Sequence, residues 1–306
     1  MNTRFLEAFV WVARLSSFRA AADRLNLTQA AISIRIASLE DSFGKSLFDR
    51  DMREVRLTSA GRLLLGHAER MLDLGRQMHS ALQTDTVLSG IVRIGVVETI
   101  VHTWLVDFLG ALQEAYPVLE IELTAEPTQR LHDQLRRGQL DVTLQSDPVI
   151  GESIYNRGIG DMPLAWIGPP DADVSSPRSV ARLVEAPLIT MTRGSQPHLA
   201  LLEACRREGV RHRTLHCVGS IAAIVRLVRA RLGIAVMPRA PVRTELEDGA
   251  LRMIPCTEPL CPLRLVVSYA ADPTSDAGRI VSEMAAREAR RYAERHGPEI
   301  ANPGPD

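Results

Sequence analysis

Residues 16–61 read SSFRAAADRLNLTQAAISIRIASLEDSFGKSLFDRDMREVRLTSAG and decide the fold of the first part of the chain. Their pattern predicts two short helices joined by a tight turn, followed by a small hairpin and the start of a long helix. A helix pair of this shape places its second helix in the major groove of DNA. The stretch therefore directs the search for function toward what the protein reads rather than what it catalyses.

The helix pair is defined by its caps and its turn. Ser16 or Ser17 can cap the first helix of the pair, and Asn26 tolerates the left-handed backbone that a sharp turn requires. Another helix precedes the pair, because apolar residues recur there at three- and four-residue steps. These residues are Phe5, Phe9, Val12 and Ala13.

The helix that Thr28 can cap has one apolar face. Apolar residues step along it by three and four positions, at Ile32, Ile36, Leu39 and Phe43. The flanking and outward positions are Gln29, Ala30, Ser33 and Arg35. Gln pairs with adenine, Arg pairs with guanine and Ser is permissive, so we predict that this face contacts bases or phosphates. For each residue taken singly, an ordinary solvated helix surface is the alternative.

A small wing is predicted after the helix pair. Leu47 and Phe48 anchor it, and it carries Arg50, Arg53 and Arg56. Arginines on such a wing lie beside the phosphate backbone and neutralise phosphates without reading the sequence. Acidic residues in the same stretch dilute this charge. We therefore expect the wing to position the protein on DNA rather than to anchor it strongly.

The composition is that of a globular protein and gives DNA binding little support. The 306 residues are 45% hydrophobic and 24% charged, with a formal net charge of −1. The first 57 residues contain nine basic and seven acidic side chains. The case for DNA binding therefore depends on where the charges lie.

The sequence opposes membrane, secreted and enzyme classes. No apolar run approaches the roughly 18–20 residues of a membrane span, and charged residues such as Arg4 and Glu7 interrupt the first segment. We therefore expect a cytoplasmic protein. There is no HExxH, P-loop or GxSxG motif, and the eight histidines show no ligand spacing. We expect no catalytic residue, no metal and no cofactor.

The N-terminal segment resembles the DNA-binding module of the LysR-type transcriptional regulators. That signature runs from an aromatic residue in the first helix, through the helix pair, to the wing and the next helix. In this chain it consists of Phe9, Ser17–Phe18, Ala21–Ala22, Leu25, Gln29, Ser33, Ile36, Leu39–Glu40, Gly44, Leu47–Phe48–Asp49–Arg50 and Thr58–Ser59–Ala60–Gly61. So many matches in one order make the resemblance specific.

Two positions depart from that signature. Ala30 stands where the family most often has proline, and Ile34 stands where a small or polar residue is common. Ile34 either touches a thymine methyl group or simply packs. The predicted DNA-binding residues are then Thr28, Gln29, Ala30, Ser33, Ile34, Arg35, Arg50 and Arg53.

A long helix is predicted from Thr58, a suitable N-cap, to about Leu88. Its apolar residues follow a 4-3-4-3-4 spacing, typical of a coiled-coil seam, at Leu64, Ala68, Met71, Gly75, Met78 and Leu82. Packing onto its own domain is the alternative. The resemblance favours a homodimer through residues 61–90, able to form a homotetramer, with two reading heads on two-fold double-stranded DNA.

From Ile91 onward the chain alternates short apolar strands with helices, which predicts an α/β domain with helices on both faces of its sheets. The predicted strands are 92–97, 119–124, 141–145, 164–167, 188–191, 215–218, 234–237, 251–254 and 263–269. The predicted helices are 106–115, 129–137, 197–208 and 221–231. Two similar halves indicate two lobes with a cleft between them.

The resemblance implies a multidomain chain. Residues 1–60 form the winged helix-turn-helix domain, 61–90 the linker helix, and 91–296 an effector-binding domain with the two-lobed fold of periplasmic binding proteins. Lobe I is assigned to 91–162 and 268–296, and lobe II to 163–267, with a disordered tail at 297–306. Residues 227–238, LVRARLGIAVMP, match a family landmark, except that Arg231 stands where a small residue or Gly is common.

Ligands of such folds lie at the carboxyl ends of strands and at helix N-termini. Residues at those places are the predicted effector-binding set: Thr99, Thr128, Ser146, Thr190, Arg193 and Ser220. Thr99, Thr128 and Ser220 are equally explained as helix caps. Arg193 can pair with a carboxylate or lie in solvent, and Glu98 disfavours a simple anion. The charge of the small-molecule effector therefore stays open.

Two alternative functions stay open. Cys205 and Cys217 lie in the predicted lobe II, and some members of the resembling family sense peroxide with a cysteine pair in this region. Thiol-redox sensing is therefore the second hypothesis for the input, although the spacing has no specific match. A stand-alone solute-binding protein is the third, and the N-terminal module opposes it.

Overall fold

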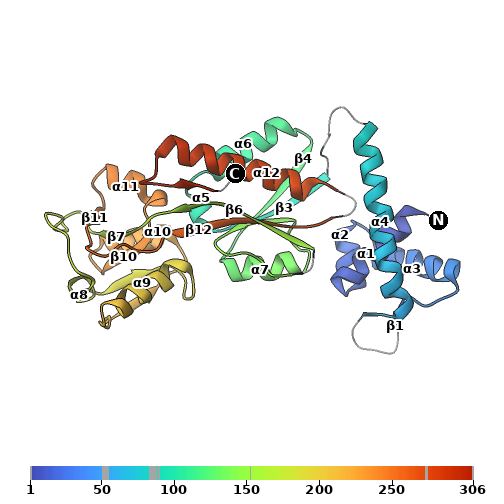
Figure 1. Ribbon diagram of the computed structural model, residues 1–306, viewed down its shortest axis with the longest axis horizontal. Helices are drawn as coiled ribbons and strands as arrows, with labels where there is room; N and C mark the ends of the chain where they lie inside the picture. The colour runs from blue at the N-terminus through green and yellow to red at the C-terminus, as the bar shows by residue number, and fades with distance from the viewer. Residues whose placement is uncertain are drawn as a thin grey trace.

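The computed structural model describes residues 2–49, 55–82, 88, 90–151, 153–272 and 275–304. These residues form a helical N-terminal domain and a larger domain built on two sheets (Figure 1). Among them, no helix is both long enough and apolar enough to cross a membrane.

The N-terminal domain has the predicted winged helix-turn-helix order. Its elements are α1 (Thr3–Leu15), α2 (Phe18–Arg24), α3 (Gln29–Phe43), β1 (Phe48–Asp49), β2 (Arg56–Leu57) and α4 (Ser59–Leu82). β1 and β2 pair in antiparallel fashion and form the base of the wing. The predicted DNA-contacting residues Arg50 and Arg53 lie outside the described residues.

Local hydrogen bonds explain where the helices begin and end. Ser17 caps α2, with its side chain accepting a hydrogen bond from the Ala20 amide, whereas Ser16 ends α1 with φ 49°. Thr28 caps α3 by accepting a hydrogen bond from the Ala31 amide at 3.2 Å. Asn26 has φ 52°, so the left-handed turn predicted at this residue is confirmed.

The core of this domain joins α1 and α3 to the wing. Of the predicted apolar face, Ile32, Ile36 and Leu39 are buried, whereas Phe43, the last residue of α3, is exposed. Glu40 is also buried, and its Oε1 accepts hydrogen bonds from the amides of Leu47 (2.7 Å) and Phe48 (3.4 Å). A buried carboxylate that accepts two backbone amides holds the wing base against α3.

Thr58 and Gly61 fix the start of α4. The Thr58 hydroxyl accepts a hydrogen bond from the Gly61 amide at 3.0 Å and donates one to the Ser46 carbonyl at 2.8 Å, which confirms the predicted cap. A Cβ atom on Gly61 would lie 2.2 Å from the Leu47 carbonyl oxygen. Only glycine allows this close approach of α4 to the wing base.

The apolar residues of α4 are divided between two faces. Leu64 and Ala68, predicted in the coiled-coil seam, pack in the core of their own domain with Leu72. Other apolar residues of the helix are exposed. We call these residues the α4 stripe: Leu63, Met71, Leu74 and Met78.

The larger domain contains two sheets among the described residues. One has the order β13-β6-β12-β5-β3-β4, and the other has the order β11-β7-β10-β8-β9. Their strands are β3 (Gly90–Val96), β4 (Leu119–Ala125), β5 (Val142–Gln145), β6 (Ile154–Met162), β7 (Leu164–Gly168), β8 (Leu188–Thr190), β9 (Leu215–Cys217), β10 (Ile234–Pro238), β11 (Arg252–Ile254), β12 (Leu263–Ala270) and β13 (Asn302–Pro303).

The helices of this domain are α5 (Glu98–Val101), α6 (Leu105–Ala115), α7 (Thr128–Arg136), α8 (Val180–Leu183), α9 (Gln196–Arg207), α10 (Ile221–Arg229), α11 (Arg243–Glu247) and α12 (Ala277–His296), with a 3₁₀ turn η1 (Ala240–Val242). Every strand and helix predicted for this domain is present, with its ends shifted by at most two residues. The first sheet with α12 forms lobe I, and the second sheet forms lobe II (Figure 1).

The predicted lobe boundary at 267 and 268 is wrong. β12 belongs to lobe I over its whole length, because it pairs with β6 from Leu263 opposite Met162 to Ala270 opposite Ile154. Lobe II therefore ends before Leu263. β6 was not among the predicted strands, because its sequence IYNRGIGDM has no regular alternation of apolar residues.

The C-terminal segment also differs from the prediction of a disordered tail. Residues 302–303 form β13, which pairs with β6, and Ala301 is buried. Gly160 has φ 127°, and a Cβ atom there would lie 2.3 Å from the Asn302 carbonyl oxygen. The missing side chain lets a segment rich in proline and glycine lie against the edge of the sheet.

Arg231 adopts the left-handed conformation, with φ 60°. A residue without a Cβ atom takes this conformation at little cost, which explains why glycine is common at this position of the landmark. The departure noted in the sequence therefore has a backbone cause.

Candidate functional site

The outer face of α3 lies opposite its buried residues. At about 100° per residue, Ala30, Ser33 and Ile34 lie on the side away from Ile32 and Ile36. All three are exposed, and Ile34 is 66% exposed. Of the two alternatives for Ile34, packing inside the domain is therefore wrong.

Gln29 and Arg35 lie at opposite edges of this face. Six positions separate them, which corresponds to a rotation of about 240°. Gln29 is exposed, whereas Arg35 is half-buried and its Nη1 donates to the Arg4 carbonyl at 3.5 Å. The Thr28 hydroxyl is occupied by its capping bond. On α3, the predicted residues thus occupy three kinds of position. Some lie on the outer side of the helix, two lie at the edges of that side, and Thr28 caps the helix.

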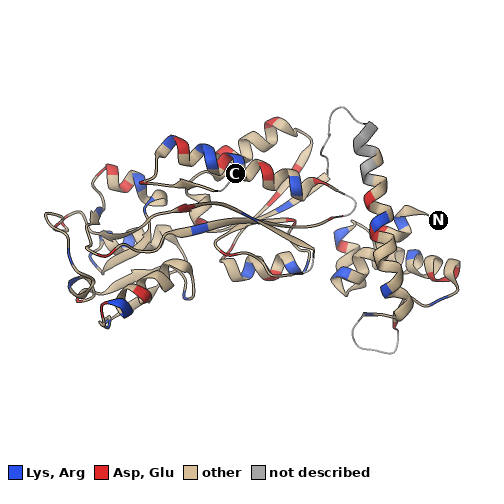
Figure 2. Cartoon of the chain, in the orientation of Figure 1, with Lys and Arg blue, Asp and Glu red and all other residues tan. Residues whose placement is uncertain are grey.

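Charges of both signs are interspersed over the chain (Figure 2). The net charge of −1 agrees with this mixture. The case for DNA contact therefore rests on the geometry of α3 rather than on net charge.

A cavity of about 670 Å³ lies between the two lobes. Its walls come from the carboxyl ends of β3, β4 and β5 and the first residues of α5 and α7 in lobe I. Lobe II contributes the segment 191–195 after β8 and the start of α9. Strand ends and helix starts from both lobes thus meet, as the sequence predicted for this fold.

Four of the six predicted effector residues line this cavity: Thr99, Thr128, Ser146 and Arg193. The hydroxyls of Thr128 and Ser146 are hydrogen-bonded at 2.8 Å, which joins the start of α7 to the end of β5. Thr99 is buried, and Arg193 is exposed. Pro127 and Val97 stand at the cap positions of α7 and α5, so Thr128 and Thr99 are not the caps.

The other two predicted residues lie outside the cavity lining. Thr190 is buried in β8, and its hydroxyl donates to the Val236 carbonyl at 3.0 Å, because a side chain inside the sheet must satisfy its hydroxyl there. Ser220 caps α10 by accepting from the Ala223 amide. Its hydroxyl also lies 3.2 Å from Glu98 Oε1, within hydrogen-bonding distance. Thr190 is therefore structural, and Ser220 connects the two lobes.

A second contact between the lobes was not predicted. The Gln196 side chain, at the start of α9, donates to Asp147 Oδ1 at 2.8 Å and accepts from the Arg264 amide at 2.8 Å. It also donates to the Ser146 carbonyl. The sequence contains a weak signal for this contact, since Gln196 directly precedes the predicted helix 197–208 and Asp147 lies just after the predicted strand 141–145. Their pairing is a long-range contact that spacing does not predict.

The cavity has mixed charge. Glu98, Glu126 and Asp147 line it together with His102, Arg130 and Arg193. Next to it, burial, followed by the positive charge of Arg193, lowers the pKa of His198. The His198 Nδ1 accepts a hydrogen bond from the Gly194 amide at 3.2 Å. A neutral imidazole thus holds the loop that carries Arg193.

Both parts of the chain match family models. Residues 3–62 match the bacterial regulatory helix-turn-helix protein, lysR family, and residues 85–289 match the LysR substrate binding domain. The chain belongs to the LysR family of transcriptional regulators. LysR-type regulators bind DNA and small-molecule effectors and form oligomers.

Relatives and solved structures agree with this assignment. The uncharacterized HTH-type transcriptional regulator YusT of Bacillus subtilis is 28% identical over 264 residues, which cover 86% of this chain and 88% of that protein. A probable hydrogen peroxide-inducible genes activator of Mycobacterium avium is 30% identical over 251 residues, 80% of each chain. The fold is similar to that of full-length OxyR from Pseudomonas aeruginosa, with a TM-score of 0.65, 21% identity and 95% of each chain covered. It is also similar to ArgP from Mycobacterium tuberculosis, with a TM-score of 0.63, 22% identity and coverage of 94% and 97%.

The four cysteines of this LysR-type chain all lie in the described residues, and each has a free thiol. Cys205 is buried in α9, and burial raises the pKa of its thiol. Cys217, in β9, is half-buried. A raised pKa keeps a thiol protonated, and the protonated thiol is the unreactive form.

Proposed function

We propose that this LysR-type regulator reads a two-fold operator with the outer face of α3. Ala30, Ser33 and Ile34 form the front of that face, with Gln29 and Arg35 at its edges. The observation that carries the proposal is the exposure of Ile34, a large apolar residue that its own domain leaves 66% uncovered. An exposed apolar side chain on the outer face of the second helix of a helix-turn-helix pair suits the methyl group of thymine.

We place the dimer contact on the α4 stripe. The stripe borders a groove of about 410 Å³ that Phe43, Leu63 and Met71 line between the end of α3 and α4. Burying these side chains against a second copy removes apolar surface from water. A homodimer of this kind carries two α3 faces, and further contacts would complete a homotetramer. A cytoplasmic location is part of the same proposal.

The cavity is the proposed site of the small-molecule effector. Thr99, Thr128 and Ser146 offer hydroxyls on the lobe I side, and Arg193 offers a guanidinium on the lobe II side. Glu98 places a carboxylate in the same cavity. These groups suit a polar effector better than they suit a simple anion. Such an effector would carry a positive group together with a negative or hydrogen-bonding group.

Binding between the lobes offers a means of regulation. Gln196 and Ser220 already bridge the lobes next to the cavity. An effector that contacts both lobes favours one arrangement of them by its difference in affinity. That difference limits how far the effector can shift the arrangement of the reading heads.

DNA binding is tested by fluorescence anisotropy on duplexes that the full-length protein selects from a random library. Ser33→Ala is expected to reduce the preference for the selected duplex over a scrambled one by about tenfold, the effect of one lost base contact. Ser42→Ala is the matched control, because Ser42 lies on the same helix and its hydroxyl donates to the Leu39 carbonyl at 2.8 Å. An equal preference in both variants would contradict the assignment of this face.

Effector binding is tested by thermal shift with a panel of amino acids and small carboxylic acids. A ligand at about 100 times its dissociation constant adds about 2.7 kcal/mol to the stability of the folded state. Arg193→Ala and Thr128→Val are expected to reduce the shift. Arg182→Ala, a control in α8 whose side chain pairs with Glu185, should retain it. A compound that shifts all three variants equally binds elsewhere.

Thiol-redox sensing is the second candidate for the input. The similarity to a probable hydrogen peroxide-inducible genes activator favours it, whereas the buried Cys205 thiol with its raised pKa opposes it. The test is DNA binding before and after peroxide, in the wild type and in Cys205→Ser. Binding that peroxide leaves unchanged in the wild type removes this candidate.

A further inference from the structure

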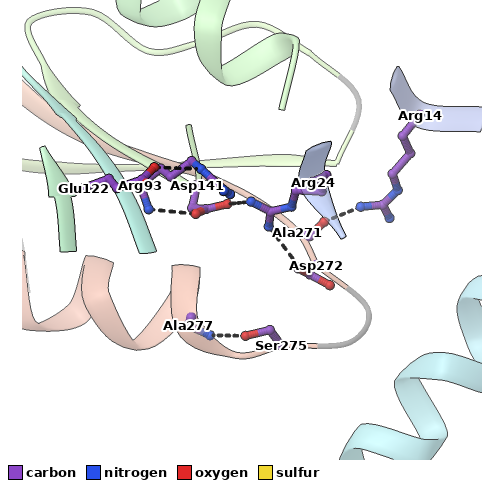
Figure 3. A network of polar contacts seen from close by, with 9 residues as sticks. All are labelled: Arg14, Arg24, Arg93, Glu122, Asp141, Ala271, Asp272, Ser275 and Ala277. Carbon is purple, nitrogen blue, oxygen red and sulfur yellow. Dashed lines mark hydrogen bonds and ion pairs between the residues drawn. The ribbon is translucent and has the colours of Figure 1, made fainter. Parts of the chain in front are cut away.

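A polar cluster joins the N-terminal domain, which we call the reading head, to lobe I (Figure 3). Arg24, the last residue of α2, lies between two carboxylates of lobe I. Its Nη1 pairs with Asp141 Oδ1, and its Nη2 lies 3.3 Å from Asp272 Oδ2. In the same contact, Arg14 at the end of α1 donates through Nη1 to the Ala271 carbonyl. Both arginines belong to the head, and all three acceptors belong to lobe I.

The ion pairs of Arg24 are more buried than typical ion pairs at a protein surface. The side chains of Arg24, Asp141 and Asp272 are 14%, 10% and 14% exposed. The guanidinium carbon of Arg24 also lies 4.6 Å from the centre of the Trp11 ring. Ion pairs shielded from solvent are screened much less by salt than exposed pairs. We call these residues the Arg24 latch: Arg14, Arg24, Asp141 and Asp272.

Lobe I holds its side of the latch through its own backbone. Asp141 Oδ2 accepts a hydrogen bond from the Arg93 amide at 2.8 Å, and the Asp141 amide donates to the Arg93 carbonyl at 2.8 Å. The Asp141 carboxylate is therefore tied to β3 whether or not the head is docked. An acceptor fixed in this way loses little side-chain entropy on pairing.

Two neighbouring strands connect the latch to the cavity. Asp141 directly precedes β5, and Ser146, which directly follows β5, lines the cavity. Leu263 opens β12 and also lines the cavity, whereas Asp272 follows the far end of that strand. β5 and β12 pair in antiparallel fashion, from Val266 opposite Gln145 to Tyr269 opposite Val142. These two strands therefore provide a direct structural connection between the cavity and the carboxylates that hold Arg24.

The latch leaves the reading face of α3 uncovered. Ala30, Ser33 and Ile34 are exposed in the docked arrangement. Docking therefore sets the direction in which α3 points and does not block contact with DNA. For a dimer with two heads, that direction determines which spacing of DNA half-sites fits.

We propose that Arg24 is a positioning residue that holds the reading head in one orientation on lobe I, and that this latch couples the head to the state of the cavity. The proposal rests on the proposed function for its biological meaning, but the docking itself does not. Without Arg24, the carboxylates of Asp141 and Asp272 lose the guanidinium that they share. Separation of the two domains hydrates both carboxylates, so the loss of Arg24 undocks the head without unfolding either domain.

The test is the distance between head and lobe I in the full-length protein. Spin labels carried by noncanonical amino acids replace Asp41 in α3 and Glu114 in α6, both exposed. Labelled chains are diluted with unlabelled protein, so that each pair reports one protomer. The wild type is expected to give one narrow distance distribution in double electron–electron resonance. Arg24→Ala is expected to lose the narrow peak, and Arg19→Ala, an exposed residue of the same helix, to retain it.

The outcomes separate the two parts of the proposal. A narrow, unchanged peak in Arg24→Ala would overturn the latch, and Asp272→Asn provides the same test from the lobe side if Arg24→Ala fails to fold. Gln196→Ala, which breaks the contact between the lobes at the cavity, is expected to shift the peak. An unshifted peak in that variant would overturn the coupling. Because no DNA is present, a failure of specific DNA binding would refute the proposed function and leave the latch intact.

Discussion

The outer face of α3 and the walls of the cavity differ in how their side chains are held. On α3, Ser33 and Ile34 are exposed, and the helix caps and the core beneath position them. In the cavity, Thr128 and Ser146 bond to each other, and next to it Gln196 bonds to three groups from the other lobe. The first surface is made by one segment with a regular period. The second is made by several segments that only the folded chain brings together.

This contrast in construction determines which kind of change affects each site. A surface built on one helix keeps its fold when an exposed side chain is replaced, but it is distorted by changes in the contacts that fix the helix. A cavity built from hydrogen-bonded segments responds to the loss of a single polar side chain, because that loss leaves a partner unsatisfied.

Gly61→Ala is expected to destabilise the N-terminal domain by about 1–3 kcal/mol, because the new Cβ atom would lie 2.2 Å from the Leu47 carbonyl oxygen. Gly66→Ala is the matched control. Its Cβ atom meets no atom within 4 Å, so alanine is expected to stabilise α4 by about 0.5–1 kcal/mol. Chemical denaturation followed by tryptophan fluorescence, to which Trp11 contributes from this domain, measures both. Equal stability of the two variants would show that the wing base does not fix α4.

Gln196→Ala is expected to reduce the stability of the effector domain by about 1–2 kcal/mol, because it removes the bonds to Asp147 and to the Arg264 amide. Gln113→Ala, on the exposed side of α6, is expected to change stability by less than about 0.5 kcal/mol. Differential scanning calorimetry distinguishes them. If both variants have the melting temperature of the wild type, the Gln196 side chain does not hold the lobes together.

Glu7→Gln is expected to have the smallest effect, and only on the docking of the head. Burial, followed by the negative charge of Asp272, raises the pKa of Glu7, while Arg35 and Arg4 lower it. The docked state therefore favours protonated Glu7, and this stabilisation is lost as the pH rises through the raised pKa. As the pH rises above the ordinary range of a glutamate, the docked fraction of the wild type should fall, and that of Glu7→Gln should fall less. If the docked fraction, measured by double electron–electron resonance, falls equally with pH in the wild type and in Glu7→Gln, Glu7 is not the titrating group.

The reading head could be predicted from the sequence almost completely. Ser17, Asn26 and Thr28 act as predicted because caps and turns depend on one residue and its near neighbours. The face of α3 follows from helical period. Phe43 was misplaced because period alone does not show where the core ends.

The cavity could be predicted only in part. Strand ends indicated Thr99, Thr128, Ser146 and Arg193, and these residues do line it. Thr190 was misassigned because its neighbour in space is Val236 of β10, far away in the sequence. The contacts of Gln196, the course of β12 and the docking of Arg24 on Asp141 depend on long-range pairing in the same way. No local pattern specifies such contacts.

The most direct test is photo-crosslinking from two exposed apolar positions. Benzoylphenylalanine replaces Ile34 on α3 or Leu63 on the α4 stripe, which are 66% and 71% exposed. Each full-length variant is irradiated in complex with the selected duplex and analysed on a denaturing gel. We predict that position 34 crosslinks to DNA and position 63 to a second protein chain. Retained DNA binding without a DNA crosslink from position 34 would contradict the claim that α3 reads the operator.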